Sequence, residues 1–318
     1  MSQKAVDQKT VLPLSIGREL YRNKTLYLMF LPLGVFYLIF AYFPMAGIIV
    51  AFKNLNYRGG IFFSPWIEPL FKNFEFFFKS GKAALVIRNT VMYNLLFLSG
   101  YTFFSVFVAI LISEINLTMF KKISQSIMFL PYFISWVVVS AFVYNLFSYE
   151  YGAVNTLFSS LGLPRINIYV TPRYWYWLLP ALYIWKWVGY GSVLYLAAIM
   201  GIDRESYESA QIDGANIFQR IWYITLPALT PTVVTLVLLG VGRIMRGEFD
   251  MFWQLVGKNG VLMDHTDIID TLVFRSLMGS SDYGMASSTG LIQSVLCLVI
   301  ITVVNGIVRK VEPDNALF

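Results

Sequence analysis

The sequence predicts an all-α integral membrane protein with six transmembrane helices. Of its 318 residues, 57% are hydrophobic and only 13% are charged, and the mean hydropathy is +0.63; a soluble domain has about 25% charged residues. The apolar residues form long continuous runs, and a helix needs about 20 such residues to cross roughly 30 Å of hydrocarbon. These runs do not alternate with a period of two, which argues against a barrel of strands.

Six stretches meet this length requirement, and we expect each to cross the membrane once. The fourth contains a single charge, Lys186, and the fifth is uncharged through Gly242. Basic residues precede the first stretch and no small-residue cleavage site follows it, so we expect a retained span and not a signal peptide. The six expected spans are residues 26–51, 89–113, 123–149, 174–202, 221–247 and 283–308.

The expected organisation is one membrane domain, residues 26–308, between an N-terminal tail (1–25) and a C-terminal tail (309–318). Residues 52–88 are too interrupted to span, and their aromatic and charged residues suit a helix in the outer interface. The aromatic run 174–177 suits the belt at the end of a span. An even number of spans places both tails on the same side of the membrane.

A polar interruption, residues 203–231, separates the fourth and fifth spans. Asp203 can cap a short helix, and Gly214 can end that helix in a left-handed conformation. Asn216 can cap a second helix, which we expect to run to Leu226. Pro227 and Pro231 lack amide protons, so we place them in a first turn or at a kink where the chain re-enters the membrane.

The residues of this interruption resemble the EAA loop of permease subunits in bacterial ATP-binding-cassette importers. The resemblance rests on Glu208-Ser209-Ala210, on Asp213-Gly214-Ala215 and on Ile224-Thr225-Leu226-Pro227. It departs from the family pattern at Ser209, where Ala is usual, and at Arg204, where Pro is common. The pattern is most similar to the branch that takes up oligosaccharides and polysaccharides, and it covers roughly residues 25–318.

This resemblance implies a type I importer permease fold in the bacterial cytoplasmic membrane, with both termini cytoplasmic. Lys and Arg are spread almost evenly over the two sides, so the orientation rests on the resemblance. The resemblance also implies that the loop docks into a cleft on an ATPase subunit. The expected ATPase-coupling residues are Tyr207, Glu208, Ser209, Ala210, Asp213, Gly214, Ala215, Phe218, Leu226 and Pro227.

The expected partners follow from the same resemblance: a paralogous second permease, two cytoplasmic ATPases, an extracytoplasmic solute-binding protein, the lipid bilayer and a sugar. Neither Gly81-Lys82 nor Gly257-Lys258 has the spacing of a phosphate loop. We therefore expect a transport subunit without catalysis or a cofactor of its own, with ATP and Mg²⁺ bound by the partner ATPase.

Lys186 lies near the middle of the fourth span, where a charge is costly and a functional role is the first hypothesis. Tyr183, Lys186 and Tyr190 share one helical face. They suit a sugar path in which rings stack on pyranosides and the ammonium group binds hydroxyls or a carboxylate. A structural ion pair between Lys186 and an acid on another span is an equal alternative.

A second polar cluster, Arg243, Arg246, Glu248 and Asp250, ends the fifth span. Arg246 and Asp250 are four residues apart and could pair along a helix, which is the slightly favoured interpretation. The alternative is a wall of the translocation cavity that accepts an acidic sugar. Nearby glycines would permit local unwinding.

The function we expect is import of an oligosaccharide, either neutral or acidic. Amino-acid or peptide import is the nearest alternative, and an ion-coupled secondary transporter is a more distant one. A membrane-embedded enzyme would need intramembrane acids, His or Cys, and the spans have almost none.

His265 with Asp264, Asp267 and Asp270 offers too few nitrogen or sulfur ligands for zinc, and we expect these acids to lie in a solvated loop. The dispersed basic residues do not predict nucleic-acid binding.

Overall fold

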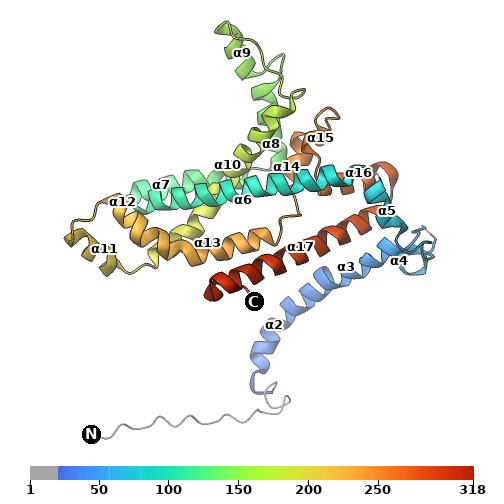
Figure 1. The fold of residues 1–318 in the computed structure, drawn as a ribbon, viewed down its shortest axis with the longest axis horizontal. Coiled ribbons are helices and arrows are strands. Elements are labelled where there is room, and N and C mark those ends of the chain that lie inside the picture. The colour runs from blue at the N-terminus through green and yellow to red at the C-terminus, as the bar shows by residue number, and fades with distance from the viewer. Residues whose placement is uncertain (1–20, 57, 80) are drawn as a thin grey trace.

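The protein is described by a computed structural model that covers residues 21–56, 58–79 and 81–318. These residues are mainly helical, and their only strand-like contact is an isolated bridge between Lys53 and Trp66. The helices α6, α13 and α17 run along the long axis, and α10 packs along α6 (Figure 1). Their bounds are Ala83–Ser113 for α6, Trp175–Met200 for α10, Leu226–Val241 for α13 and Tyr283–Val311 for α17.

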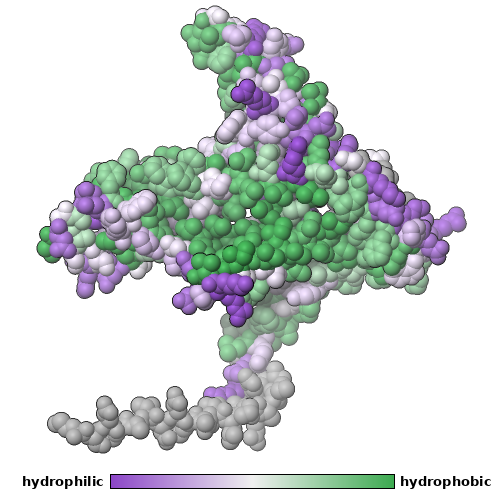
Figure 2. All heavy atoms as spheres, in the orientation of Figure 1, coloured by the Kyte–Doolittle hydropathy of each residue, from purple (hydrophilic) through white to green (hydrophobic). Residues whose placement is uncertain are grey.

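Four continuous helical segments of the described chain are long and apolar enough to cross a membrane: Lys24–Phe52, Ala83–Ser113, Ile217–Val241 and Tyr283–Val311. Hydrophobic side chains cover this central part of the molecule, and polar ones gather at its ends (Figure 2). At 26 residues α10 is long enough, but its tryptophans, tyrosines and Lys186 keep its hydropathy below that of the four. The chain is a multi-pass membrane protein, while the number of six spans stays a prediction.

The third expected span, 123–149, is wrong as a single straight helix. It consists of α7 (Thr118–Phe129), a 3-10 turn (Leu130–Phe133) and α8 (Trp136–Phe147), and it bends by 94° at the break. Pro131 contributes to this break because it lacks an amide proton. The helix α8 and the following α9 (Ala153–Ser160) consequently project away from the bundle (Figure 1).

The fifth expected span, 221–247, has different ends in the structure. Helix α12 (Ile217–Arg220) continues through a π-turn (Ile221–Thr225) directly into α13. The second helix of the polar interruption therefore does not stop at Leu226. At its other end α13 stops at Val241, and the chain forms turns until α14 (Phe249–Leu255) begins.

The first helical segment contains α2 (Lys24–Tyr37), a π-turn (Leu38–Tyr42), α3 (Phe43–Met45) and a 3-10 turn (Ala46–Phe52). Only this last turn packs closely against α17, and the remainder leaves the bundle (Figure 1). Most of the expected N-terminal tail, residues 1–20, lies outside the described residues. At the other end the chain folds back, and Asn305 bonds the Leu317 amide and the Phe318 carbonyl at 2.8 and 2.7 Å.

Short helices cover the end of the bundle that lies opposite α11. The two nearest the first span are α4 (Gly60–Phe63) and α5 (Lys72–Lys79), and the latter lies in the expected interfacial segment. The others are α14, α15 (Met263–Thr266) and α16 (Ile269–Ser280). Two buried clusters lie beneath them: one has Tyr93, Phe97, Trp136, Trp175, Leu179 and Phe252 from α6, α8, α10 and α14, and the other has Phe77 of α5, Ile269 and Leu272 of α16 and Met285 of α17.

The contact between α10 and α7 gives a first prediction. A Cβ on Gly189 would lie 1.9 Å from the Met128 carbonyl oxygen, and this neighbour is backbone that cannot rotate away. Gly189→Ala should therefore destabilise the protein by at least about 1–3 kcal/mol, and a lower melting temperature of the detergent-solubilised protein measures this. Gly290→Ala is the matched control, since no atom lies within 4 Å of the added carbon. Equal melting temperatures for the two variants would contradict this packing.

Candidate functional site: a coupling element and two interrupted spans

The polar interruption forms two short helices joined at a left-handed glycine. Helix α11 (Arg204–Ile212) begins at Asp203, whose carboxylate accepts from the Glu205 amide at 3.1 Å. It ends in a Schellman motif, in which Gly214 has φ +80° and the Ala215 amide donates to the Ala210 carbonyl at 2.9 Å. These caps confirm the local chemistry expected from the sequence.

The second helix of this element starts with a reciprocal cap. The Asn216 side chain accepts from the backbone amide of Gln219 at 2.9 Å, and the Gln219 side chain accepts from the backbone amide of Asn216 at 2.8 Å. These two backbone amides at the start of α12 therefore have hydrogen-bond partners within the same helix and need none from the rest of the bundle. We call the segment from Asp203 to Arg220 the bent element.

Two side-chain contacts join the bent element to the long helices. The Tyr207 hydroxyl bonds the Thr225 hydroxyl at 2.8 Å, which links α11 to the π-turn before α13. The Arg220 guanidinium lies 3.7 Å from the carboxylate of Glu114, the C-cap residue of α6. The bent element is therefore attached to both α13 and α6. Arg220, Thr225 and Glu114 were not among the residues predicted from the sequence, because their partners are distant along the chain.

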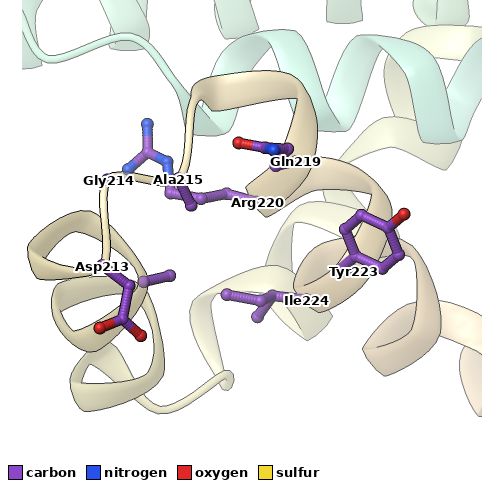
Figure 3. Close-up of a pocket in the computed structure, with 8 residues that line it drawn as sticks. Asp213, Gly214, Ala215, Gln219, Arg220, Tyr223 and Ile224 are labelled. Carbon is purple, nitrogen blue, oxygen red and sulfur yellow. The ribbon is translucent and has the colours of Figure 1, made fainter.

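The opposite surface of the bent element is open. Ile212 and Phe218 are 87% and 78% exposed. Between the two helices lies a groove of about 320 Å³, which extends to Tyr223 and Ile224 on the π-turn (Figure 3). Among the predicted coupling residues, Glu208, Ser209, Asp213, Phe218 and Pro227 are exposed, Tyr207, Ala210, Ala215 and Leu226 are partly buried, and Gly214 lies at the exposed joint. Their role in coupling stays a prediction.

Lys186 bonds to backbone carbonyl groups. Its ammonium group is buried and donates to the carbonyls of Pro131 at 3.3 Å, Tyr132 at 3.1 Å and Ile134. These are carbonyls of the break between α7 and α8, and that of Pro131 also accepts from the Ile134 backbone amide at 3.1 Å. An ammonium group has three donors, so these three contacts use all of them. No ion pair of Lys186 with an acid occurs among residues 21–56, 58–79 and 81–318, and its place in a sugar path stays a prediction.

The aromatic residues near Lys186 form stacked pairs. Tyr183 stacks on Phe97 of α6, with ring centroids 4.4 Å apart, and Tyr190 stacks on Tyr132 of the break, at 5.1 Å. Trp187 contacts Tyr132 edge-on. Phe97 and Tyr132 join the predicted tyrosines only through the tertiary fold, so the spacing along one helix could not identify them, whereas Trp187 lies four residues after Tyr183 on α10 and could have been found from that spacing.

The second polar cluster lies on a non-helical segment, residues 242–248, which we call the unwound segment. Arg246 lies on this segment and Asp250 lies in α14, so the two residues do not share a helix. The pair expected between them along one helix is therefore wrong. Arg243 and Arg246 are exposed, whereas Ile244 and Met245 between them are buried. Neither guanidinium group has an ion-pair or hydrogen-bond partner within the described ranges.

Glu248 connects the unwound segment to the other break. Its carboxylate accepts from the indole nitrogen of Trp136, the first residue of α8, at 3.1 Å. The Lys186 ammonium group lies 5.2 Å from the centre of the same indole ring. Trp136 therefore lies between the two polar clusters that the sequence predicted as separate.

The solvated loop expected for the acids between the fifth and sixth spans is wrong for Asp267 and Asp270, which are buried and partly buried, whereas Asp264 is exposed. Asp267 is 6% exposed and forms an ion pair with Arg275 and a hydrogen bond with Thr271. Burial raises the pKa of the Asp267 carboxyl group, although the Thr271 hydroxyl and the Arg275 charge oppose this shift. The imidazole of His265 bonds the Tyr176 hydroxyl at 2.7 Å. The His265 imidazole thus joins α15 to α10, and the Asn89 and Tyr93 side chains of α6 donate to the carbonyls of Asp267 and His265.

Comparisons with known proteins agree with this arrangement. Residues 102–316 match the family described as binding-protein-dependent transport system inner membrane component. Protein LplB of Bacillus subtilis is 31% identical, over 93% of this chain and 92% of its own length. The polygalacturonan/rhamnogalacturonan transport system permease protein YteP of the same organism is 30% identical, over 92% and 90%.

Solved structures also resemble this chain. A crystal structure of a bacterial transporter involved in the import of the acidic polysaccharide alginate contains a chain that is 33% identical. The TM-score is 0.83, and the match covers 93% of this chain and 99% of that one. A second structure, in complex with an alginate pentasaccharide-bound periplasmic protein, gives a TM-score of 0.82 at 32% identity.

The Lys186 contacts generate a prediction about stability. Lys186→Met keeps the length of the side chain but removes the lysine donor from the Tyr132 and Ile134 carbonyls of the break, and each unsatisfied group removed from water costs about 1–3 kcal/mol. We expect a melting temperature well below that of the parent in detergent. Lys122→Met, at an exposed lysine of α7, is the matched control and should melt like the parent. A Lys186→Met protein that keeps the parental melting temperature but changes its sugar preference would instead assign Lys186 to the substrate path.

Proposed function

Because the chain belongs to the family of binding-protein-dependent transport system inner membrane components, we propose that it is the permease subunit of an ATP-driven importer for an acidic oligosaccharide. The observation that carries the proposal is the bent element. It is a small rigid structure with an exposed apolar surface, and it is attached to α6 and α13 by Arg220 and Tyr207. Such a structure can transmit a displacement without any chemistry of its own.

The partners follow from what this chain lacks in its sequence. It has no phosphate loop, so a separate ATPase must bind ATP and Mg²⁺. We assign the exposed side chains Ile212 and Phe218 to the contact with this ATPase, which places the bent element and both termini in the cytoplasm. A second permease subunit and an extracytoplasmic binding protein complete the proposed assembly. Closure of the ATPase pair would then move the bent element and switch the spans from inward-facing to outward-facing.

The substrate class rests on Arg243 and Arg246. Both are exposed on the unwound segment, without partners in the described chain, and a guanidinium group matches a carboxylate in shape and charge. The names of two similar transporters mention polygalacturonan and alginate. Both are polysaccharides with acidic groups. The stacked rings of Tyr183 and Tyr190 offer apolar surfaces near the same path. We therefore propose that the two arginines bind the uronate carboxylates as the sugar passes.

The coupling role predicts the effect of Gly214→Pro. Proline cannot adopt φ +80° and removes the amide that donates to Gln211, so the joint between α11 and α12 should be lost. We expect membrane insertion to persist while uptake and substrate-stimulated ATP hydrolysis disappear in proteoliposomes that contain the full assembly. Glu208→Lys, which reverses the charge of an exposed coupling residue, should have the same effect. Normal uptake by Gly214→Pro would count decisively against this role.

The substrate class predicts the effect of removing the two guanidinium charges. A hydrogen bond to a charged group is worth about 1.5–3 kcal/mol, so Arg243→Gln and Arg246→Gln should each lower the maximal rate of acidic oligosaccharide uptake roughly tenfold or more. The rate is measured in proteoliposomes with saturating loaded binding protein, and basal ATP hydrolysis should not change. Arg165→Gln, at an exposed arginine outside the unwound segment, is the control. Parental uptake by the double variant would exclude the arginines from the path.

A further inference from the structure

The unwound segment is held by side chains from three helices. The Asn94 amide, on α6, donates to the carbonyls of Ile244 at 2.9 Å and Arg246 at 3.1 Å. The Gln293 amide, on α17, donates to the Met245 carbonyl at 2.5 Å. The Asp270 carboxylate, on α16, accepts from the Gly247 amide at 2.7 Å.

Two of these three side chains also contact each other. The Gln293 amide donates to the Asp270 carboxylate at 3.2 Å, and Gln293 is buried. Asn94 lies on α6 and Gln293 on α17, which are separate helices of the bundle (Figure 1). We call Asn94, Asp270 and Gln293 the amide clamp. It bonds four consecutive backbone positions, 244–247.

The depth of the amide clamp explains why it is needed. Asn94 is eleven residues from the start of α6, and Gln293 is ten from the start of α17. At about 1.5 Å per residue, both lie roughly 15–17 Å from the helix ends that are opposite the bent element. At such a depth a backbone polar group without a partner costs several kcal/mol, so a non-helical segment persists only where other groups bond it.

The clamp also fixes the direction of side chains. While the carbonyls of 244–246 are held against α6 and α17, Ile244 and Met245 are buried and Arg243 and Arg246 are exposed. If the chain rewound into a continuation of α13, Arg243 and Arg246, three residues apart, would still share a helical face, but the carbonyls of 244–246 would point along the helix axis and lose their bonds to α6 and α17. The close contact at Gly247 supports the fixed geometry, since an added Cβ would lie 2.2 Å from the Ile268 side chain.

From these contacts we propose that Asn94, Asp270 and Gln293 are positioning residues, which keep the fifth span open so that Arg243 and Arg246 face the substrate path together. The proposal rests on the proposed function for the identity of the substrate, an acidic oligosaccharide. The geometric part, an interruption maintained by three side chains, stands on the contacts alone. The clamp does not touch the sugar in this proposal.

The test uses the full importer assembly with two readouts. Cys297 is the only cysteine of the chain, so Cys297→Ala gives a cysteine-free background in which Arg246→Cys can be labelled with a membrane-impermeant cationic thiol reagent. The labelling rate measures the exposure of position 246, and uptake is measured in the same background with Arg246 retained.

The clamp variants remove the hydrogen-bond donors one side chain at a time. Asn94→Leu removes the donor to the carbonyls of Ile244 and Arg246, and Gln293→Met removes the donor to the carbonyl of Met245. The matched control is Asn145→Leu, because the exposed Asn145 amide bonds only the Ala141 carbonyl of its own helix.

We expect each clamp variant to slow labelling at position 246 and to lower the maximal uptake rate, both by roughly tenfold, as the loss of a hydrogen bond to the backbone of the unwound segment indicates. Asn145→Leu should leave both readouts unchanged. Unchanged labelling in a folded clamp variant, or slower labelling with parental uptake, would overturn the proposal. If neither variant gave a folded assembly, the clamp would be assigned to folding alone, which would also overturn it.

The two proposals can fail separately. If Arg243→Gln and Arg246→Gln leave uptake unchanged but the clamp variants slow labelling, the acidic substrate is wrong while the geometry of the clamp stands. If the arginine variants lose uptake but the clamp variants behave like Asn145→Leu, the positioning role is wrong while the substrate class stands.

Discussion

The structure depends on how backbone polar groups are bonded where a membrane helix stops. In hydrocarbon each freed carbonyl or amide must find a partner within the protein. The chain solves this twice with side chains: Lys186 bonds three carbonyls at the break after α7, and Asn94, Gln293 and Asp270 bond the segment after α13. Tyr183 of α10 stacks on Phe97 of the adjacent α6 and Ile184 contacts Gly100, so Lys186 lies deeper in the bundle than Asn94. Trp136 contacts both sites, through Glu248 and through the Lys186 ammonium group.

The same helices connect these two breaks to the bent element. Helix α6 carries Asn94 and ends at Glu114, which pairs with Arg220. Helix α13 starts directly after the π-turn that Tyr207 bonds, and its other end is the unwound segment. Its 16 residues span about 24 Å and connect the bent element to the unwound segment as one continuous helix. A displacement of the bent element therefore has a physical route to the residues proposed to meet the substrate.

Local chemistry was predictable from the sequence, and tertiary chemistry was not. Asp203, Gly214 and Asn216 act on amides within a few residues of themselves, so their caps could be predicted from spacing alone. The apolar run 123–149 contains no charge, and nothing in its hydropathy marks the 94° bend. Lys186 could be recognised as a costly charge, but its partners are carbonyls more than 50 residues away, and the identity of a residue says nothing about its carbonyl. Asp267 was expected in solvent because its partners Thr271 and Arg275 lie beyond the acidic cluster that drew attention to it.

The engagement of the nearby acids explains why the two arginines remain available. Glu248 accepts from Trp136, and Asp270 accepts from Gly247 and Gln293, so both carboxylates have donors other than arginine. Asp250 lies in the first turn of α14, where the helix dipole stabilises a negative charge. A guanidinium group within the membrane is tolerated only beside water or an opposite charge. Since the chain's own acids are bonded elsewhere or stabilised in place, a transient anionic group can bind Arg243 and Arg246 without breaking an existing ion pair, and it can leave again for the same reason.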